Sequence, residues 1–335
     1  MKQIDTILQD VNVDTSTVKL VKCVQAHNEE GWIEYNLANC YDEFDTIRVL
    51  EGAVHGRPNS TPDGHSIDKT REIIKNFPDP ANKIELYSYS RPFDSLEQMK
   101  QVFLDVSSPD ELLCISDADE FYLDGQINRL RKILSLRPSL SQVVPMFLHF
   151  WRDAKHIRNM DENYTIQHQR FLRYEQGMRY HDHPVATNAN GVCTYFSNEY
   201  QPRKVVPVEP LYIFHYGHAK GAEAFKAKKA FYDKELAKFA ANDGKTAAQA
   251  FDVNFREFIE RKEKDSDVLL YDGPHPSVML NHPIMSQEDE HLKNKVFKHW
   301  KDGTIYGEKD VPLIAVWMYK QFARMPAIYN PLEGA

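Results

Sequence analysis

The chain has 335 residues, of which 42% are hydrophobic, 27% charged and 12% aromatic. These proportions argue against a disordered chain and leave room for one large domain with an appendage or for two modest domains. The 41 lysines and arginines against 49 aspartates and glutamates give a formal net charge of −8. No overall basic field therefore attracts the chain to nucleic acid or anionic lipid.

Up to residue 120 the sequence alternates between short β-branched runs and helical patterns. We predict strands at 17–30 (running into a loop), 45–52, 83–90 and 111–116, with helices between them at 31–44, 60–77 and 94–106. This alternation is typical of an α/β fold with a mostly parallel sheet covered by helices. In such sheets ligands bind beyond the carboxyl ends of the strands.

After residue 140 the pattern changes. Aromatic strands are expected at 141–151, 165–174 and 209–218, and helical patterns at 219–242, 247–264, 287–300 and 311–324. We therefore expect an α/β domain over 1–220 and a mainly helical region over 221–335 that packs on it.

Three carboxylates stand where the fourth strand ends, in Asp117-Ala118-Asp119-Glu120. Like charges so close repel one another, so a positive partner is expected unless the run is a hydrated turn. A D-x-D at a strand end can bind a divalent cation, which neutralises the carboxylates and holds a diphosphate. The haloacid-dehalogenase phosphatases also use a D-x-D. They place it on their first strand and favour Thr or Val where this chain has Phe121.

Two histidine clusters could complete such a site. His215 and His218 end a predicted strand, and imidazole is a common ligand of divalent metals, although either ring could simply form a hydrogen bond in the core. Asp182 lies between two histidines in H-D-H-P, which suits a general base, although an Asx turn before proline is the alternative.

Basic side chains could meet phosphate or sugar hydroxyls. Arg170 and Arg173 are candidates, with surface ion pairs as the alternative. The lysine-rich stretch 219–238 is more typical of a solvated helix face than of a phosphate site. The sequence contains no P-loop, G-x-G-x-x-G, H-E-x-x-H or G-x-S-x-G motif, which argues against four large enzyme classes.

Five segments, in consistent order over about residues 18–240, resemble the family 2 glycosyltransferases of the GT-A fold. The matching segments are VQAHNEE (24–30), the loop region 49–73, LLCISDADEF (112–121), QRFLRYEQGMRYHDHP (169–184) and LYIFHYGH (211–218). Three positions depart from the family pattern. Glu51 stands where Asp is usual, His27 where Asn or Lys is usual, and Asp182 where Glu is commoner.

The resemblance implies a GT-A (Rossmann-like) sheet flanked by helices, with the helical C-terminal region on the acceptor side. It also implies an inverting, metal-dependent transfer of a hexose or pentose from a nucleoside-diphosphate sugar, with a UDP-sugar as the expected donor. The metal would be Mn²⁺ or Mg²⁺, bound by Asp119 and His215, with His218 as the substitute for His215. Asp182 would take the proton from the acceptor hydroxyl.

The resemblance assigns the donor contacts as well. The nucleobase and ribose would lie against the loop after the first strand and the end of the second, at Ala26, His27, Asn28, Glu29 and Glu51. Asp117 would contact the ribose or a metal-bound water. Arg170 and Lys220 would contact the diphosphate or the acceptor.

The acceptor and two alternative functions stay open. A glycan, a lipid-linked sugar, a protein side chain or a modified nucleobase in DNA would all suit a base at Asp182, although the net charge disfavours DNA. A sugar-nucleotide nucleotidyltransferase would need a Gly-rich loop, which residues 25–33 lack. A non-catalytic carbohydrate- or nucleic-acid-binding module would not need both Asp119 and His215.

The expected location is the cytoplasm, of a bacterium or of a cell infected by a virus. Residues 1–17 lack the apolar core of a signal peptide, and no apolar run has the length of a membrane span. The four cysteines are scattered and form no C-x-x-C pair, so we expect reduced thiols, as is usual for cytosolic proteins.

Overall fold

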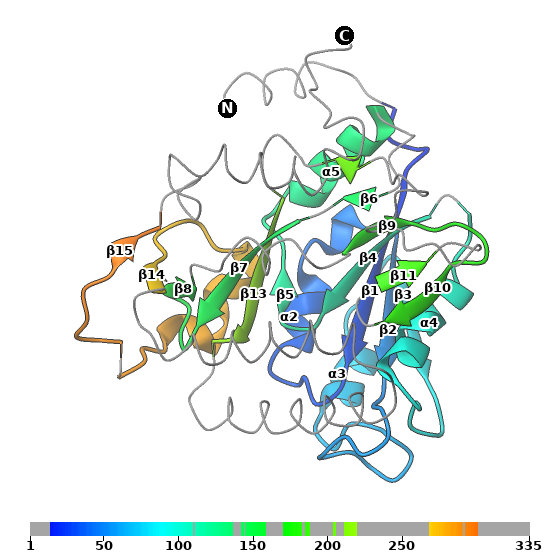
Figure 1. Ribbon diagram of the computed structural model, residues 1–335, viewed down its shortest axis with the longest axis horizontal. Helices are drawn as coiled ribbons and strands as arrows, with labels where there is room; N and C mark the ends of the chain where they lie inside the picture. Colours follow the sequence, from blue (N-terminus) through cyan, green and yellow to red (C-terminus); the bar gives the residue numbers. More distant parts are fainter. Residues whose placement is uncertain are drawn as a thin grey trace, which may run out of the picture.

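The computed structural model (Figure 1) describes ten segments of the chain. These are residues 14–109, 111–136, 142–143, 145–158, 170–182, 185–187, 204–205, 211–219, 268–290 and 292–300. At 142, 143, 146, 181, 182, 185–187, 204 and 205 the description covers the backbone alone.

The larger sheet has seven strands in the order β12-β6-β9-β4-β1-β2-β3. Its parallel part consists of β1 (Lys19–Ala26), β2 (Thr46–Glu51), β3 (Ile84–Ser88) and β4 (Glu111–Asp117). β9 (Phe171–Arg173) runs antiparallel to β4, followed by β6 (Gln142–Val143) and β12 (Lys204–Val205). The four strands predicted up to residue 120 are therefore confirmed, together with their parallel arrangement.

Helices cover both faces of this sheet (Figure 1). Side chains of β1 alternate between two cores, with Leu20 and Val24 in one and Val21 and Cys23 in the other. α2 (Ile33–Ala38) and α5 (Gln126–Leu136) contribute to the first core, and α4 (Leu96–Asp105) contributes to the second. α3 (Thr70–Asn76) follows the long loop after β2. Burial on both faces explains why β1 and β4 carry apolar residues on both faces rather than on alternate positions only, and the expected α/β class is confirmed.

The second sheet has six strands in the order β15-β14-β8-β7-β13-β5. Its members are β5 (Glu120–Phe121), β7 (Met146–Trp151), β8 (His156–Arg158), β13 (Tyr212–His218), β14 (Val268–Leu270) and β15 (Lys298–His299). The chain leaves the first sheet at Asp117 and enters the second at Glu120. The D-x-D run is thus the crossing point between the two sheets.

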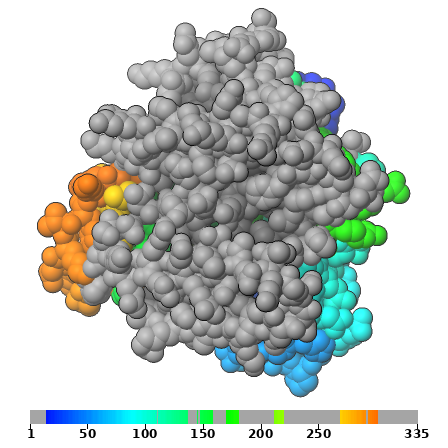
Figure 2. Space-filling model, in the orientation of Figure 1, coloured from blue at the N-terminus to red at the C-terminus, as the bar shows by residue number. Residues whose placement is uncertain are grey.

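Two further parts complete the described chain. A hairpin of β10 (Arg179–Asp182) and β11 (Val185–Thr187) packs near α4. After β14, the 3₁₀ helices η3 (Ser277–Asn281) and η4 (Pro283–Ser286) precede β15. Figure 2 shows the 290–300 region, in orange, on the opposite side of the surface from the blue and cyan loops and helices of 50–109.

The helix expected at 287–300 is wrong for the described residues, which form turns and β15. Contacts with distant segments explain this. The Asp289 amide donates to the Asp153 carboxylate (3.3 Å), and β15 pairs with β14. The helices expected at 219–242, 247–264 and 311–324 lie outside the described residues. In the part of the chain that is described, no helix is long and apolar enough to cross a membrane.

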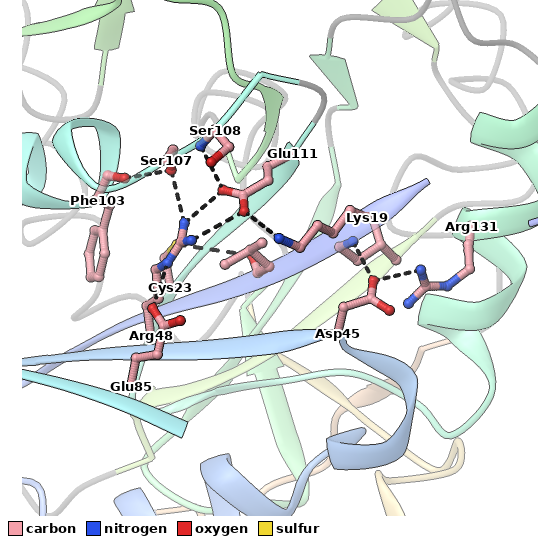
Figure 3. A network of polar contacts seen from close by, with 12 residues as sticks. Lys19, Cys23, Asp45, Arg48, Glu85, Phe103, Ser107, Ser108, Glu111 and Arg131 are labelled. Carbon is pink, nitrogen blue, oxygen red and sulfur yellow. Dashed lines mark hydrogen bonds and ion pairs between the residues drawn. The ribbon is translucent and has the colours of Figure 1, made fainter. Parts of the chain in front are cut away.

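A buried ion network ties the strands together near the amino ends of β1 and β4 (Figure 3). Arg48 of β2 donates to Glu111 (2.8 Å) and to Glu85 (3.0 Å), and Lys19 also donates to Glu111 (2.9 Å). Burial alone would raise the pKa of Glu111, but the hydrogen bonds from Arg48 and Lys19 outweigh it and lower that pKa. Glu111 and Asp117 are the two ends of β4, which places the network about 20 Å from the D-x-D run.

Replacing Arg48 tests what this network contributes to stability. Arg48→Met leaves the buried Glu111 carboxylate with only part of its charge compensation, so we expect a loss of about 3 kcal/mol in the free energy of unfolding. Urea denaturation at pH 7 measures it. The double variant Arg48→Met/Glu111→Gln should recover part of the loss. If it is as unstable as Arg48→Met or less stable, the uncompensated Glu111 carboxylate is not the cause of the loss.

Candidate functional site

Three side chains form a row across the second sheet. β13 pairs antiparallel with β5 and parallel with β7, and the register sets His215 opposite Glu120 on one side and His149 on the other. Directly opposed residues project from the same face of a sheet. The crossing point after β4 therefore brings the D-x-D carboxylates to the imidazoles of β13 and β7.

Arg170 is the positive partner that the three carboxylates require. Its Nη2 donates to Asp117 Oδ2 (2.8 Å) and to Glu120. The side chains of Arg170 and Glu120 are 5% and 1% exposed, whereas that of Asp117 is 42% exposed. Burial raises the pKa of Glu120 to about 8, against the pull of Arg170 and with the help of Asp117 and Asp119. Of the two carboxylates that Arg170 holds, Asp117 is thus the one that a ligand can reach.

Asp119 turns away from Arg170 toward β13. Its Oδ1 lies 3.6 Å from His215 Nε2, and its backbone oxygen accepts from the Tyr216 amide (2.9 Å). Gly217 faces both side chains. A Cβ added at this position would lie 2.5 Å from Asp119 Oδ2 and 2.5 Å from His215 Nε2. The lack of a Cβ at Gly217 therefore allows the Asp119 and His215 side chains to lie close together against the backbone of β13.

A bulge in β13 brings a second histidine to the same face. In a regular strand His215 and His218 would project to opposite faces, but the pairing with β7 shifts register between them. Their rings lie 4.9 Å apart. With His149 they form a cluster whose ligand atoms all lie within 4.8 Å of one another. One carboxylate and several imidazoles are donors that suit a divalent transition metal, so the residues present fit the expected ion.

The sequence analysis did not identify His149. Its Nδ1 lies 2.7 Å from His215 Nδ1, and its ring stacks on Phe147 at 5.2 Å. The one available signal was a histidine within the apolar run of β7, a position that an apolar residue would normally take.

Two buried asparagines hold the D-x-D turn, Asn36 in α2 and Asn39 directly after it, and neither was identified from sequence. Asn36 Nδ2 donates to the backbone oxygens of Asp117 (3.2 Å) and Glu120 (3.0 Å). Asn39 exchanges two 2.8 Å hydrogen bonds with the backbone of Tyr122. Helix α2 thereby fixes the turn from which Asp119 projects.

The loop after β1 is joined to the long loop after β2. Asn28, in the left-handed region at φ 55°, donates through Nδ2 to the Asn59 oxygen (2.6 Å), and its amide donates to Ser66 Oγ (3.0 Å). His27 Nε2 lies 2.9 Å from Ser60 Oγ. Burial, with a smaller effect of nearby Arg57, lowers the pKa of His27 to about 4, so this ring is neutral at pH 7.

Glu51 is enclosed beneath these loops. Its side chain is fully buried and accepts from the Ser66 amide (2.7 Å), with His65 Nδ1 at 2.8 Å. In this arrangement Glu51 positions His65 and Ser66, and the carboxylate itself has no exposed surface. Ala26 pairs with Glu51 in the sheet and is also buried, while the exposed edge is formed by parts of residues 27–29.

A buried lysine lies beside the D-x-D run. Lys100 of α4 is 1% exposed, with its ammonium 5.9 Å from the Tyr180 ring. Burial, with a smaller effect of Arg170 and against the pull of Asp117, lowers the pKa of Lys100 to about 7. Protonating this amine in the folded chain is therefore costly.

Lys100→Met should stabilise the protein in a pH-dependent way. The unfolded chain holds the proton up to about pH 10.4, so between about pH 7 and 10 it binds more protons than the folded chain, and stability rises with pH. Below pH 7 the folded chain bears the full cost of burying a protonated Lys100. Replacing the lysine there should add about 3–5 kcal/mol to the free energy of unfolding. Thermal unfolding at pH 6 and 9.5 measures it, with exposed Lys75→Met as the control. A gain that does not shrink with pH would contradict this account.

Two predicted site residues are not placed. Asp182 is the last residue of β10 and its backbone pairs with Val185, but its side chain is outside the description. Lys220 lies outside the described residues. The structure thus brings together Asp117, Asp119, Arg170, His215 and His218, and places residues 26–29 and Glu51 at the same edge of the sheet.

Comparisons with known proteins give matches to structures only. No protein-family model matches the sequence, and no curated protein matches it. Among solved structures, the chain is similar to a mannosyltransferase from Pyrobaculum calidifontis in complex with GDP-Man and Mn²⁺, at 16% identity and a TM-score of 0.42, over 76% of this chain and 72% of that one.

Two further solved structures show lower similarity. The 4-diphosphocytidyl-2C-methyl-D-erythritol synthase of Anaerococcus prevotii matches at 12% identity and a TM-score of 0.27, over 48% of this chain and 70% of that one. A putative glucose-1-phosphate thymidylyltransferase of Bacillus anthracis matches at 7% identity and a TM-score of 0.28, over 47% and 69%.

Proposed function

We propose that this protein is a metal-dependent glycosyltransferase that moves a sugar from a nucleoside-diphosphate sugar to an acceptor hydroxyl. One observation carries the proposal. Asp119 Oδ1 and His215 Nε2 lie 3.6 Å apart over the backbone of Gly217, just beyond the carboxyl end of a central parallel strand. Ligands of parallel α/β sheets bind at that edge.

The separation of these two atoms suits a shared cation. Bonds of about 2.1 Å at angles of 90–120° place two ligand atoms roughly 3.0–3.6 Å apart. Because imidazole nitrogen is a poor ligand for Mg²⁺, we propose Mn²⁺ of the two ions expected from the sequence. A cation held there stabilises the negative charge that the leaving nucleoside diphosphate acquires.

The donor would lie between this site and the loop after β1. Asp117 is the accessible carboxylate of the D-x-D run and would contact the ribose. Residues 27–29 would line the nucleobase, with Glu51 acting through His65 and Ser66. Arg170, held by two carboxylates, would lend positive charge to the diphosphate side without binding it as a free cation.

The transfer itself needs a base, which we propose is Asp182. The acceptor oxygen forms a bond to the anomeric carbon while the bond from that carbon to the diphosphate oxygen breaks. The acceptor proton passes to Asp182, and the diphosphate leaves with the electron pair. Attack opposite to the leaving group inverts the anomeric centre.

Asp182→Asn is expected to lower kcat by about a hundredfold, because an amide cannot take the proton. Donor binding should change little, since Asp182 acts on the acceptor. Steady-state kinetics and calorimetric titration of the donor measure the two effects. Wild-type kcat in this variant would remove Asp182 from the mechanism.

A donor screen tests the proposed function. The protein is incubated with Mn²⁺ and UDP-, GDP-, TDP- or ADP-sugars, with UDP-sugars first, and release of the nucleoside diphosphate is measured with and without glycan acceptors. The same protein is incubated with nucleoside triphosphates and sugar 1-phosphates, and pyrophosphate is measured. We expect diphosphate release alone. Pyrophosphate release would identify a nucleotidyltransferase. If the protein releases no product and binds no donor, the glycosyltransferase and the nucleotidyltransferase proposals are both refuted.

A further inference from the structure

We propose that His149 is a positioning residue for the metal site, because its Nδ1 accepts the Nδ1–H of His215 and so presents His215 Nε2 without a proton to Asp119. This inference rests on the proposed function, since it concerns the ion bound there. The inference gives a role to His149, which belongs neither to the D-x-D run nor to the histidine pair of β13.

The distance between the two rings identifies a hydrogen bond. The Nδ1 atoms are 2.7 Å apart, which is a hydrogen-bond length. Two nitrogens that bind one ion at about 2.1 Å would lie roughly 3.0 Å apart or farther. His149 and His215 therefore share a proton through these atoms rather than a metal.

The direction of the bond follows from the other nitrogen of His215. A neutral imidazole carries one proton, so a proton on Nδ1 leaves Nε2 free to bind a metal. His215 Nε2 is the atom that lies 3.6 Å from Asp119 Oδ1 and faces the backbone of Gly217. Donation from His215 to His149 is thus the arrangement in which His215 can act as a ligand.

The surroundings of His149 keep its ring in place. The side chain is buried, its ring lies almost parallel to that of Phe147 (9°), and it meets His215 edge-on (86°). The parallel pairing of β7 with β13 sets His149 directly opposite His215. A rigid acceptor at this point fixes both the tautomer and the orientation of the ligand ring.

The chemistry of the acceptor has a consequence for the metal. Histidine ligands commonly donate their second N–H to a carboxylate, which raises their basicity. A neutral imidazole in that role raises it less and adds no negative charge to a site that already holds three carboxylates.

Two measurements test the proposal on the full chain. In metal-free protein, ¹⁵N chemical shifts of labelled histidines report the tautomers, and we expect His215 protonated on Nδ1 and His149 on Nε2. Mn²⁺ affinity is then measured by calorimetry for the wild type, His149→Asn and His149→Phe. Asparagine can place an oxygen near the former Nδ1, whereas phenylalanine keeps the stacking on Phe147 and removes the acceptor.

The expected result is a 10- to 100-fold loss of Mn²⁺ affinity in His149→Phe and a loss of a few-fold at most in His149→Asn. Equal, complete loss in both variants would make His149 a direct ligand and overturn the proposal, as would unchanged affinity in His149→Phe. If the wild type binds no Mn²⁺, the proposed metal site fails. The tautomers test the direction of the hydrogen bond independently of metal binding. A proton on Nε2 of His215 would overturn this inference by itself.

Discussion

Asp119→Asn is expected to abolish Mn²⁺ binding at the site and to lower sugar transfer by at least about 10³-fold. Among the described residues, Asp119 is the carboxylate that lies against His215 Nε2, whereas Asp117 and Glu120 are both held by Arg170. A bound cation stabilises the leaving diphosphate by several kcal/mol, and each 1.36 kcal/mol is a factor of ten in rate. Metal titration and initial rates of nucleoside diphosphate release measure the two losses.

The control is Asp42→Asn, which neutralises an exposed carboxylate in the 3₁₀ helix before β2. It changes the net charge by the same amount as Asp119→Asn. The Mn²⁺ affinity and the rate of nucleoside diphosphate release should both stay within twofold of the wild type. Circular dichroism and the unfolding midpoint confirm that Asp119→Asn is folded. Full Mn²⁺-dependent activity in a folded Asp119→Asn protein would show that the ion binds elsewhere.

Gly217→Ala adds a single methyl group and is expected to lower Mn²⁺ binding and sugar transfer about as much as Asp119→Asn does. The added carbon would lie 2.5 Å from both Asp119 Oδ2 and His215 Nε2, a distance that real Cβ atoms do not show. The φ of Gly217 is not in the left-handed region, so the backbone accepts alanine and the conflict is with the two proposed ligands. We expect them to be pushed apart, with Mn²⁺ affinity and transfer reduced by about 10³-fold.

Gly31→Ala is the matched control, because a Cβ at Gly31 meets nothing within 4 Å and its φ is also not in the left-handed region. It should retain wild-type affinity and rate. Gly217→Ala should remain folded, since the methyl group replaces no core contact. Normal Mn²⁺ binding in this variant would mean that the ion does not depend on the close approach of Asp119 and His215 over Gly217.

The main sheet could be predicted from sequence because its strands are buried on both faces. β4 contains the apolar run Leu112–Ile115, β1 is rich in apolar residues, and helical patterns separate the strands, as is typical of a parallel sheet covered by helices. The segment 287–300 could not be predicted, because its conformation depends on distant partners. The Asp153 carboxylate and the edge of β14 override its local helical pattern.

The candidate site was predictable to the extent that its residues follow one another along a strand. The D-x-D run and the histidines of β13 could be identified in this way. Their partners could not, because His149 meets His215 only through the register of β7 with β13, and Asn36 reaches the D-x-D turn only through the packing of α2. The pairing of Arg170 with Asp117 and Glu120 likewise depends on β9 lying beside β4.

Anomalous diffraction from crystals grown with Mn²⁺ and a nucleoside diphosphate tests the central claim most directly. The account predicts one strong manganese peak within about 2.3 Å of both Asp119 and His215 Nε2, with diphosphate oxygens completing its coordination. A manganese peak that contacts neither residue, or a bound diphosphate with no manganese beside Asp119, would contradict it.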